Sequence, residues 1–282
     1  LGRQLRPQAP PTDVRLVKGS HIVVPRMYEG DAAYLLQNPD GRVVFVIPYE
    51  DQFSLIGTTE EEYQGDPSAA EISQAEITYL LDVVRNYFKK VPDASQIRHQ
   101  FSGVRPLIDD GDKNASKVSR DYTLELERIP APLLTVYGGK ITTYRRLAES
   151  AMDQLKSLFP SMRPAWTMHA HLPGGDFESQ QALEDRLADE FSWAERTLLR
   201  SWVRRYGTHC RKWLEGAKQI DDLGHCFGPG MYEREIRYLI EHEWARTADD
   251  ILWRRTKSGL RLTAQQRSAV ALFCQDSLKL KN

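Results

Sequence analysis

The first half of the chain alternates short apolar runs with turn residues, a pattern typical of an antiparallel sheet. The apolar runs lie at residues 14–17, 21–24, 43–47 and 53–56. Residues 38–41 (Asn-Pro-Asp-Gly) and 49–52 (Tyr-Glu-Asp-Gln) separate the later runs and have the composition of tight turns. The pattern predicts an antiparallel meander.

A helix is predicted next. Its apolar positions repeat at helical spacing and are Ile77, Leu80, Leu81, Val84 and Phe88. Ser68 and Glu71 have the spacing of a capping box, and Pro92 ends the pattern. We expect this helix to cover one face of the sheet.

Two strands and a second helix are predicted before residue 160. The strand-like runs are residues 122–126 and 133–137, and the polar stretch 109–114 before them is expected to be a surface loop. Gly138 and Gly139 break the second run, and a helix follows. Its apolar face consists of Ile141, Tyr144, Ala148, Ala151, Leu155 and Leu158.

The remaining chain has helical periodicity. The helical segments are residues 178–190, 192–206, 232–246, 247–255 and 263–280. Thr247 and Asp250, like Thr263 and Gln266, have capping spacing, and Gly207 suits a helix carboxyl cap.

These elements predict an α+β fold. We expect a proline-containing linker at residues 1–13, an antiparallel-sheet region with a covering helix at 14–132, a strand-helix pair at 133–159 and an all-α domain at 160–282.

The balance of charges in the sequence argues against nucleic acid and anionic membranes as partners. The 282 residues include 38 basic and 39 acidic side chains, so no net field attracts nucleic acid or an anionic membrane. No apolar run approaches the roughly 20 residues that span a bilayer, and the first residues lack the apolar core of a signal peptide. We expect a soluble, cytoplasmic chain, and its start at Leu1 suggests that an upstream segment was removed.

The three cysteines predict neither a disulfide framework nor a zinc site. The count is odd and CxxC spacing is absent. The pairs His209-Cys210 and His225-Cys226 could be drawn as a metal site, but structural zinc ligands usually come in pairs spaced two to four residues apart. We expect no bound metal.

Residues 136–145 (Val-Tyr-Gly-Gly-Lys-Ile-Thr-Thr-Tyr-Arg) form the most informative local motif. Gly138 and Gly139 allow a ligand to approach the backbone, and the free amides of a helix start favour an anion. Lys140, Thr142 and Thr143 would add charge and hydrogen-bond donors. The alternative interpretation is a plain strand-to-helix turn.

Three further basic residues lie at turns or element ends. Arg105, in residues 102–107 (Ser-Gly-Val-Arg-Pro-Leu), and Arg120 could bind a phosphate or carboxylate through the guanidinium fork, although a single arginine is usually a solvated surface residue. His21, at the end of Lys18-Gly19-Ser20-His21, could take a proton from a hydroxyl at neutral pH. More often such a histidine is structural, and it is the combination of these groups that favours a site.

Four ordered motifs resemble the FAD-dependent glycerol-3-phosphate dehydrogenases. They are residues 18–25 (Lys-Gly-Ser-His-Ile-Val-Val-Pro), 56–59 (Ile-Gly-Thr-Thr), 102–106 (Ser-Gly-Val-Arg-Pro) and 138–145 (Gly-Gly-Lys-Ile-Thr-Thr-Tyr-Arg). Residues 243–245 (Glu-Trp-Ala) and 250–260 (Asp-Ile-Leu-Trp-Arg-Arg-Thr-Lys-Ser-Gly-Leu) are similar to the carboxyl-terminal helical domain of that family.

The resemblance implies a reaction and roles for these residues. In that family FAD takes a hydride from C2 of sn-glycerol 3-phosphate to give dihydroxyacetone phosphate, and the electrons pass to membrane quinone. His21 and Arg105 match catalytic positions, and Arg105, Arg120 and Lys140 match groups around the substrate. The segment from Gly138 to Thr143, including Ile141, matches a flavin contact. Residues 14–132 would then be the substrate-binding cap region and 133–159 the returning strand-helix of the FAD-binding domain.

The chain departs from the family in two places. Glu60 follows Gly-Thr-Thr where the family commonly has Asp, and no G-x-G-x-x-G occurs to hold the FAD pyrophosphate. We therefore expect an incomplete, carboxyl-terminal portion of the enzyme that is inactive by itself.

Other interpretations stay open. They are an oxygen-using glycerol-3-phosphate oxidase and a stand-alone module that binds a phosphorylated metabolite. The family also implies a homodimer as a possible assembly and a peripheral contact with the cytoplasmic face of the inner membrane.

Overall fold

The computed structural model describes residues 14–108, 121–128 and 131–279. The chain divides into two compact units, residues 1–168 and 169–282. The predicted linker at residues 1–13 and the loop at 109–114 lie outside the described residues. No described helix is long and apolar enough to cross a membrane.

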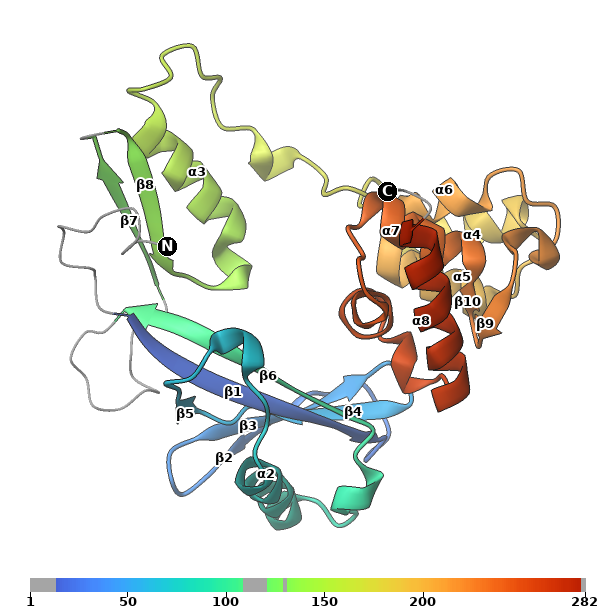
Figure 1. Ribbon diagram of the computed structural model, residues 1–282, viewed down its shortest axis with the longest axis horizontal. Coiled ribbons are helices and arrows are strands. Elements are labelled where there is room, and N and C mark those ends of the chain that lie inside the picture. The colour runs from blue at the N-terminus through green and yellow to red at the C-terminus, as the bar shows by residue number, and fades with distance from the viewer. Residues whose placement is uncertain (1–13, 109–120, 129–130, 280–282) are drawn as a thin grey trace. The chain divides into compact units, whose positions relative to one another are not determined.

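A six-stranded antiparallel sheet organises the first unit (Figure 1). Its strands are β1 (Val14–Pro25), β2 (Tyr34–Gln37), β3 (Val43–Tyr49), β4 (Phe53–Gly57), β5 (Glu61–Glu62) and β6 (His99–Ile108). The order is β2-β3-β4-β1-β5, and β6 pairs with the other edge of β1. Two of the predicted strands, at 14–17 and 21–24, are one continuous strand in the structure.

Helix α2 (Gln74–Tyr87) packs against one face of this sheet (Figure 1). Side chains of both elements form the core, in particular Ile22, Val24, Val44, Val46, Ile56, Ile77, Leu80, Leu81 and Val84. The predicted covering helix is thus present. Short 3-10 turns, η1 (Pro67–Ala69) and η2 (Ala94–Gln96), flank it.

The capping box predicted at Ser68 and Glu71 is wrong. Ser68 belongs to the turn η1, where its amide donates to the side chain of Asp66. The box is formed by Ser73 and Glu76, which have the same spacing: the Glu76 amide donates to Ser73 Oγ (3.2 Å) and the Ser73 amide donates to the Glu76 carboxylate (2.7 Å).

A hairpin and a helix complete the first unit. Strands β7 (Tyr122–Glu127) and β8 (Leu133–Gly138) pair antiparallel, and the turn η3 (Ile141–Thr143) leads into α3 (Tyr144–Leu155). A further turn, η4 (Thr167–His169), spans the boundary between the two units. Helix α3 lies beside the hairpin (Figure 1).

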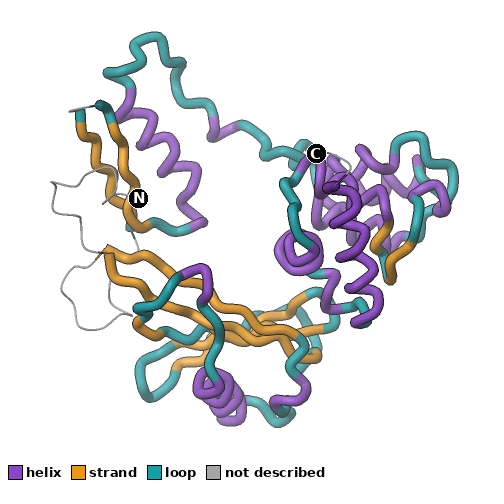
Figure 2. Tube along the Cα trace, viewed as in Figure 1, coloured by secondary structure: helices purple, strands orange, loops and turns teal. Residues whose placement is uncertain are grey.

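The second unit is mostly helical (Figure 2). Its helices are α4 (Gln180–Glu190), α5 (Arg196–Tyr206), α6 (Arg211–Leu214), α7 (Glu233–His242), a π-helix η7 (Asp250–Arg255) and α8 (Ala264–Lys279). Its 3-10 turns are η5 (Gly207–Cys210), η6 (Ile220–Leu223) and η8 (Ser258–Leu260). The capping pairs at Thr247 with Asp250 and Thr263 with Gln266 are confirmed, as is the Gly207 cap.

The all-α expectation for this unit needs one correction. Strands β9 (Cys226–Gly228) and β10 (Met231–Tyr232) form a short antiparallel ribbon. Gly228 and Gly230 have positive φ values of 151° and 73°, so glycine lets the chain reverse where other residues would be strained.

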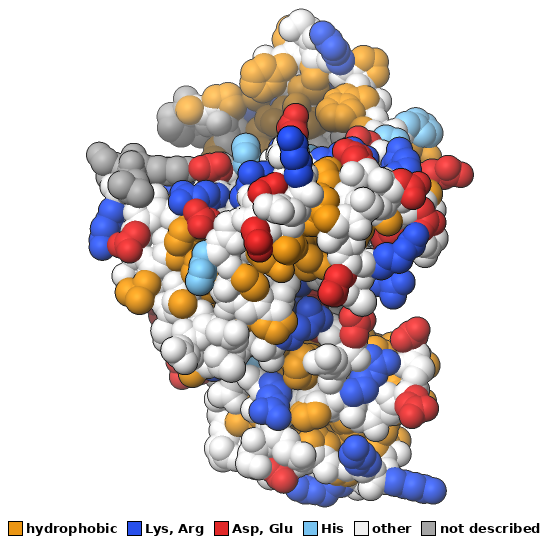
Figure 3. All heavy atoms as spheres, turned by 90° about the vertical axis from the view of Figure 1, so that its right-hand side faces the viewer, with side chains coloured by type: hydrophobic (Ala, Val, Ile, Leu, Met, Phe, Trp, Pro, Cys, Tyr) orange, Lys and Arg blue, Asp and Glu red, His pale blue; other side chains and the backbone are white. Residues whose placement is uncertain are grey.

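The surface carries both signs of charge. Figure 3 shows basic and acidic side chains interspersed over one face, with apolar side chains between them. This distribution agrees with the net charge of −1.

The helical core predicts a matched pair of stability effects. Leu239 is fully buried and Leu272 is 63% exposed, and both lie in helices. Leu239→Ala should lower the free energy of unfolding by about 2–5 kcal/mol because it leaves a cavity, whereas Leu272→Ala should change it by under about 0.5 kcal/mol. Urea unfolding followed by tryptophan fluorescence checks this, since Trp202 and Trp213 pack in the same core. Equal effects would contradict the assigned packing.

Candidate active site

The face of the sheet opposite α2 carries two of the predicted site residues, His21 and Arg105. The register places His21 of β1 opposite Gly57 of β4 and Phe101 of β6, and Gly19 opposite Gly103. Arg105 lies opposite Val17. Because directly opposite residues share a face and side chains alternate along each strand, His21 and Arg105 lie on the same face.

The His21 ring is held between an aromatic ring and a glycine. It stacks on Phe101 with ring centroids 5.1 Å apart and planes 8° from parallel. A Cβ atom at Gly57 would lie 2.2 Å from His21 Cδ2, so only glycine leaves room for the ring. His21 Nδ1 is buried and has no hydrogen-bond partner in the described part of the chain.

His21 is neutral at physiological pH. Burial, together with the positive charge of Arg105, lowers the pKa of His21 to about 4. A neutral imidazole has a ring nitrogen that can accept a proton, which is the property that a general base requires.

The Arg105 guanidinium occupies space left by a second glycine. A Cβ atom at Gly19 would lie 2.8 and 2.9 Å from the two terminal nitrogens of Arg105, and 2.5 Å from Thr58 Oγ1. Arg105 Nη2 donates to Thr58 Oγ1 at 3.3 Å. The glycines of two sequence motifs, Gly19 and Gly57, therefore make room for the two predicted catalytic side chains.

The strand-to-helix motif forms a separate feature. Gly138 and Gly139 have φ values of 68° and 98°, and a Cβ at Gly138 would lie 2.8 Å from the carbonyl oxygen of Asp121. Lys140 precedes η3 without a side-chain cap, and Ile141 is 87% exposed. The first amides of this helical segment are thus free of side-chain caps.

The predicted site residues fall into two groups. His21 and Arg105 come together, while in the described part of the chain the Lys140 side chain makes no hydrogen bond or ion pair with either. Arg120 lies outside the described residues. Two contributors were missed: Thr58, which accepts from Arg105, and Phe101, which stacks on His21. Thr58 lies in the motif at residues 56–59 (Ile-Gly-Thr-Thr), but its contact with Arg105 depends on how the strands pair and could not be read from the motif.

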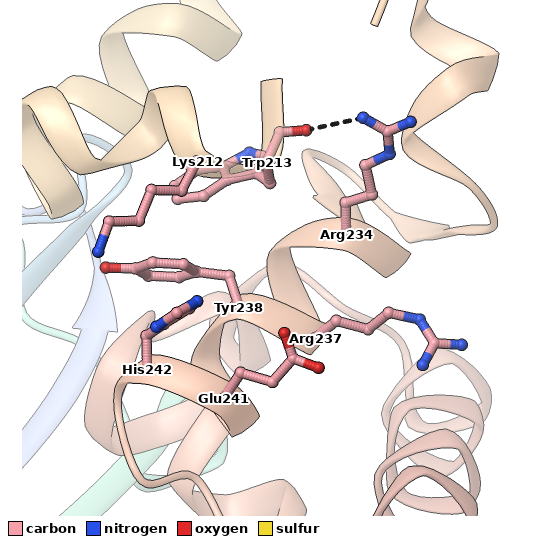
Figure 4. Close-up of a pocket in the computed structure, with 7 residues that line it drawn as sticks. All are labelled: Lys212, Trp213, Arg234, Arg237, Tyr238, Glu241 and His242. Atoms are coloured by element: carbon pink, nitrogen blue, oxygen red, sulfur yellow. Dashed lines mark hydrogen bonds between the residues drawn. The ribbon is translucent and has the colours of Figure 1, made fainter. Parts of the chain in front are cut away.

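The second unit has a shallow hollow of about 270 Å³ (Figure 4). It is lined by Lys212, Trp213, Arg234, Arg237, Tyr238, Glu241 and His242. Figure 4 shows Lys212 beside Tyr238, while Arg234 and Arg237 extend away from it. Arg234 donates to the Trp213 and Glu215 carbonyls, and Arg237 pairs with Glu233. The charged groups of Lys212, Arg234 and Arg237 therefore do not point toward a common position where an anion could bind.

No candidate metal site is found among residues 14–108, 121–128 and 131–279. No group of three or more His, Cys, Asp or Glu side chains gathers there in a way that could hold an ion.

Comparison with known proteins identifies the family. Residues 1–145 match the family model described as FAD dependent oxidoreductase. The chain belongs to this family. Residues 165–275 match a second model, the C-terminal domain of alpha-glycerophosphate oxidase.

Three relatives of this chain carry dehydrogenase names. A glycerol-3-phosphate dehydrogenase of Pseudomonas aeruginosa is 50% identical, over 95% of this chain and 53% of its own length. The aerobic glycerol-3-phosphate dehydrogenase of Escherichia coli is 48% identical, over 93% of this chain and 53% of its own length. A D-erythritol 1-phosphate dehydrogenase of Brucella abortus is 47% identical, over 91% and 52%. The resemblance seen in the sequence motifs is confirmed.

A solved structure shares the fold of this chain. The X-ray structure of the glycerol-3-phosphate dehydrogenase from Bacillus halodurans, complexed with FAD, superposes with a TM-score of 0.72 at 23% identity. The match covers 98% of this chain and 60% of that one. The chain spans about half the length of the curated relatives it matches.

The neutral state of His21 can be measured directly. We expect its ring to titrate with a pKa of about 4, and Arg105→Met to raise that pKa because, without the nearby positive charge, only burial lowers it. NMR of histidine ring nitrogens during a pH titration, assigned with His21→Asn, measures both. Arg42→Met serves as the control, since Arg42 pairs with Asp40 instead. A wild-type pKa near the ordinary 6.5 would refute the assigned burial.

Proposed function

We propose that this chain supplies the substrate-binding and catalytic face of a flavoenzyme that oxidises sn-glycerol 3-phosphate to dihydroxyacetone phosphate. FAD supplies the hydride acceptor, and quinone receives the electrons. The observation that carries the proposal is the placement of a neutral His21 beside the Arg105 guanidinium on one sheet face. The names of relatives at 47–50% identity support the choice of substrate.

The two side chains have complementary roles in this proposal. Arg105 binds the anionic substrate through its fork of donors, which orients C2. A ring nitrogen of His21 accepts the proton of the C2 hydroxyl while the hydride leaves C2, so that the alcohol becomes a ketone and two electrons pass to the flavin. Arg120 and Lys140 are further candidates for substrate binding.

The segment from Gly138 to Thr143 fits one edge of a flavin. Its amides are free of side-chain caps, Ile141 is exposed and the helix dipole favours negative charge, which is what a reduced flavin develops. We assign the cofactor contact to Gly138, Gly139, Lys140, Ile141, Thr142 and Thr143. Residues 14–132 then form the cap region, 133–159 the returning strand-helix of the FAD-binding domain and 160–282 the helical domain.

Two related functions have specific support. The match of residues 165–275 to a glycerophosphate oxidase model favours oxygen as an alternative acceptor. The Brucella relative named for D-erythritol 1-phosphate favours a longer polyol phosphate as an alternative substrate. Both alternatives keep an anionic phosphate and an alcohol to be oxidised.

Turnover measurements separate these functions. With the protein produced at the full length of its relatives and loaded with FAD, we expect glycerol 3-phosphate to reduce a quinone analogue faster than it reduces oxygen. Glycerol should be a poor substrate because it lacks the phosphate that Arg105 binds. Faster turnover with oxygen, or with erythritol 1-phosphate, would replace the proposed acceptor or substrate.

The glycine pair across β1 and β6 offers a matched test of the site. Gly19→Ala should lower kcat/KM on the order of 100-fold, because the new Cβ displaces the Arg105 guanidinium and Thr58. Gly103→Ala, directly opposite in the ladder, meets nothing within 4 Å and should change kcat/KM by about twofold at most. Steady-state kinetics of both folded variants checks this. Similar losses would argue against a role for Arg105.

A further inference from the structure

A buried carboxylate lies on the sheet face opposite His21 and Arg105. Glu76 of α2 is 2% exposed. One of its oxygens accepts hydrogen bonds from Ser20 Oγ (2.7 Å) and Thr59 Oγ1 (2.6 Å). The other accepts from the Ser73 amide (2.7 Å) and pairs with Lys18 Nζ (2.8 Å). We call this set of contacts the Glu76 network.

The Glu76 network ties together the backbone segments that carry the candidate site. Lys18 and Ser20 are the two neighbours of Gly19 in β1, and Ser20 precedes His21. The Ser20 amide donates to Thr59 Oγ1 (2.9 Å), and the Thr59 amide donates to the Ser20 carbonyl (3.3 Å). One carboxylate therefore fixes β1 and the end of the Gly57-Thr58-Thr59 segment relative to each other.

Strand β6 joins the network through a hydroxyl pair. Ser20 Oγ and Ser102 Oγ are 2.8 Å apart. Ser102 precedes Gly103 and lies three residues before Arg105 in the same strand. The network thus contacts each of the three segments that supply His21, Gly57 and Arg105.

We propose that Glu76 is a positioning residue for His21 and Arg105, acting through the sheet from its opposite face. The importance of this role for catalysis rests on the proposed function, because that function assigns His21 and Arg105 to the substrate. Glu76 itself does not reach the substrate in this proposal. Glu76 fixes the pairing register of β1. That register sets the position of the His21 ring and the space that Gly19 leaves for the Arg105 guanidinium.

The chemistry of the network favours positioning over simple stabilisation. A buried ion pair often stabilises a fold no better than apolar side chains of the same volume, and its best-attested use is to select one register. Burial alone would raise the pKa of Glu76, but the hydrogen bonds from Lys18, the Ser73 amide, Thr59 and Ser20 outweigh it and hold the pKa at about 2. The carboxylate is ionised, and all its partners are directional donors.

The experiment compares Glu76→Gln with the wild type in the full-length, FAD-loaded protein. Loss of a negative charge by itself would lower the pKa of His21 further. We expect the opposite result. Without the Glu76 carboxylate the His21 ring moves from its place between Phe101 and Gly57, so its burial falls and its pKa rises toward 6.5, by about one pH unit or more. We also expect kcat/KM for glycerol 3-phosphate to fall about tenfold or more.

Two further variants complete the design. Thr59→Val removes the hydroxyl that bonds both Glu76 and the Ser20 amide, and it should move both readouts in the same direction as Glu76→Gln. If Glu76→Gln does not fold, Thr59→Val decides the question. Glu184→Gln is the matched control. Glu184 is likewise a buried helix carboxylate, but it pairs with Arg200 where Glu76 pairs with Lys18, and it lies in the second unit.

The outcomes are distinguishable. Unchanged His21 titration and unchanged kcat/KM in a folded Glu76→Gln or, where that fails, Thr59→Val variant would overturn the positioning role. Equal changes in Glu184→Gln would overturn it as well, since they would report general destabilisation. If the wild type does not oxidise glycerol 3-phosphate, the proposed function fails, while the His21 titration still tests the positioning role.

Discussion

The alternation of side chains along β1 is the constraint on which the first unit depends. Even-numbered residues such as Ile22 and Val24 enter the core against α2, and odd-numbered Gly19 and His21 face the other side. A shift of one residue would exchange the two sets and bury the imidazole among apolar side chains. Core packing and the candidate active site are therefore fixed by the same strand register.

Much of the fold could be predicted from local patterns, because apolar periodicity and turn chemistry act over short distances. The covering helix, the hairpin before Gly138 and the helices of the second unit follow from such patterns. The continuity of β1 did not, since Lys18, Gly19 and Ser20 interrupt its apolar run. They are held in the strand by β6, and by the carboxylate of Glu76, which contacts Lys18 and Ser20. Pairing between residues about 80 positions apart cannot be derived from local periodicity.

The candidate site was predictable in its chemistry but not in its geometry. His21 and Arg105 stood out because they are basic residues at turn-like motifs, and both now lie on one face. The need for glycine at positions 19 and 57 could not be predicted, because each leaves space for a side chain of another strand: Gly19 for Arg105 and Gly57 for His21. Glu76 was hidden for a related reason: in sequence it is an ordinary acidic residue in the first turn of a helix, and only the folded sheet brings hydroxyls to it.

On the proposed function, the closeness of His21 and Arg105 couples anion binding to proton transfer. Burial and then the charge of Arg105 lower the pKa of His21, so the imidazole is neutral but a weak base. A phosphate bound by Arg105 would offset that positive charge and raise the pKa of His21, which strengthens the base when the substrate is present. Linkage requires the converse with the same free energy: a proton on His21 would strengthen phosphate binding. On the proposed function, an alcohol without the phosphate would therefore lose both its anchor and part of the basicity that its oxidation needs.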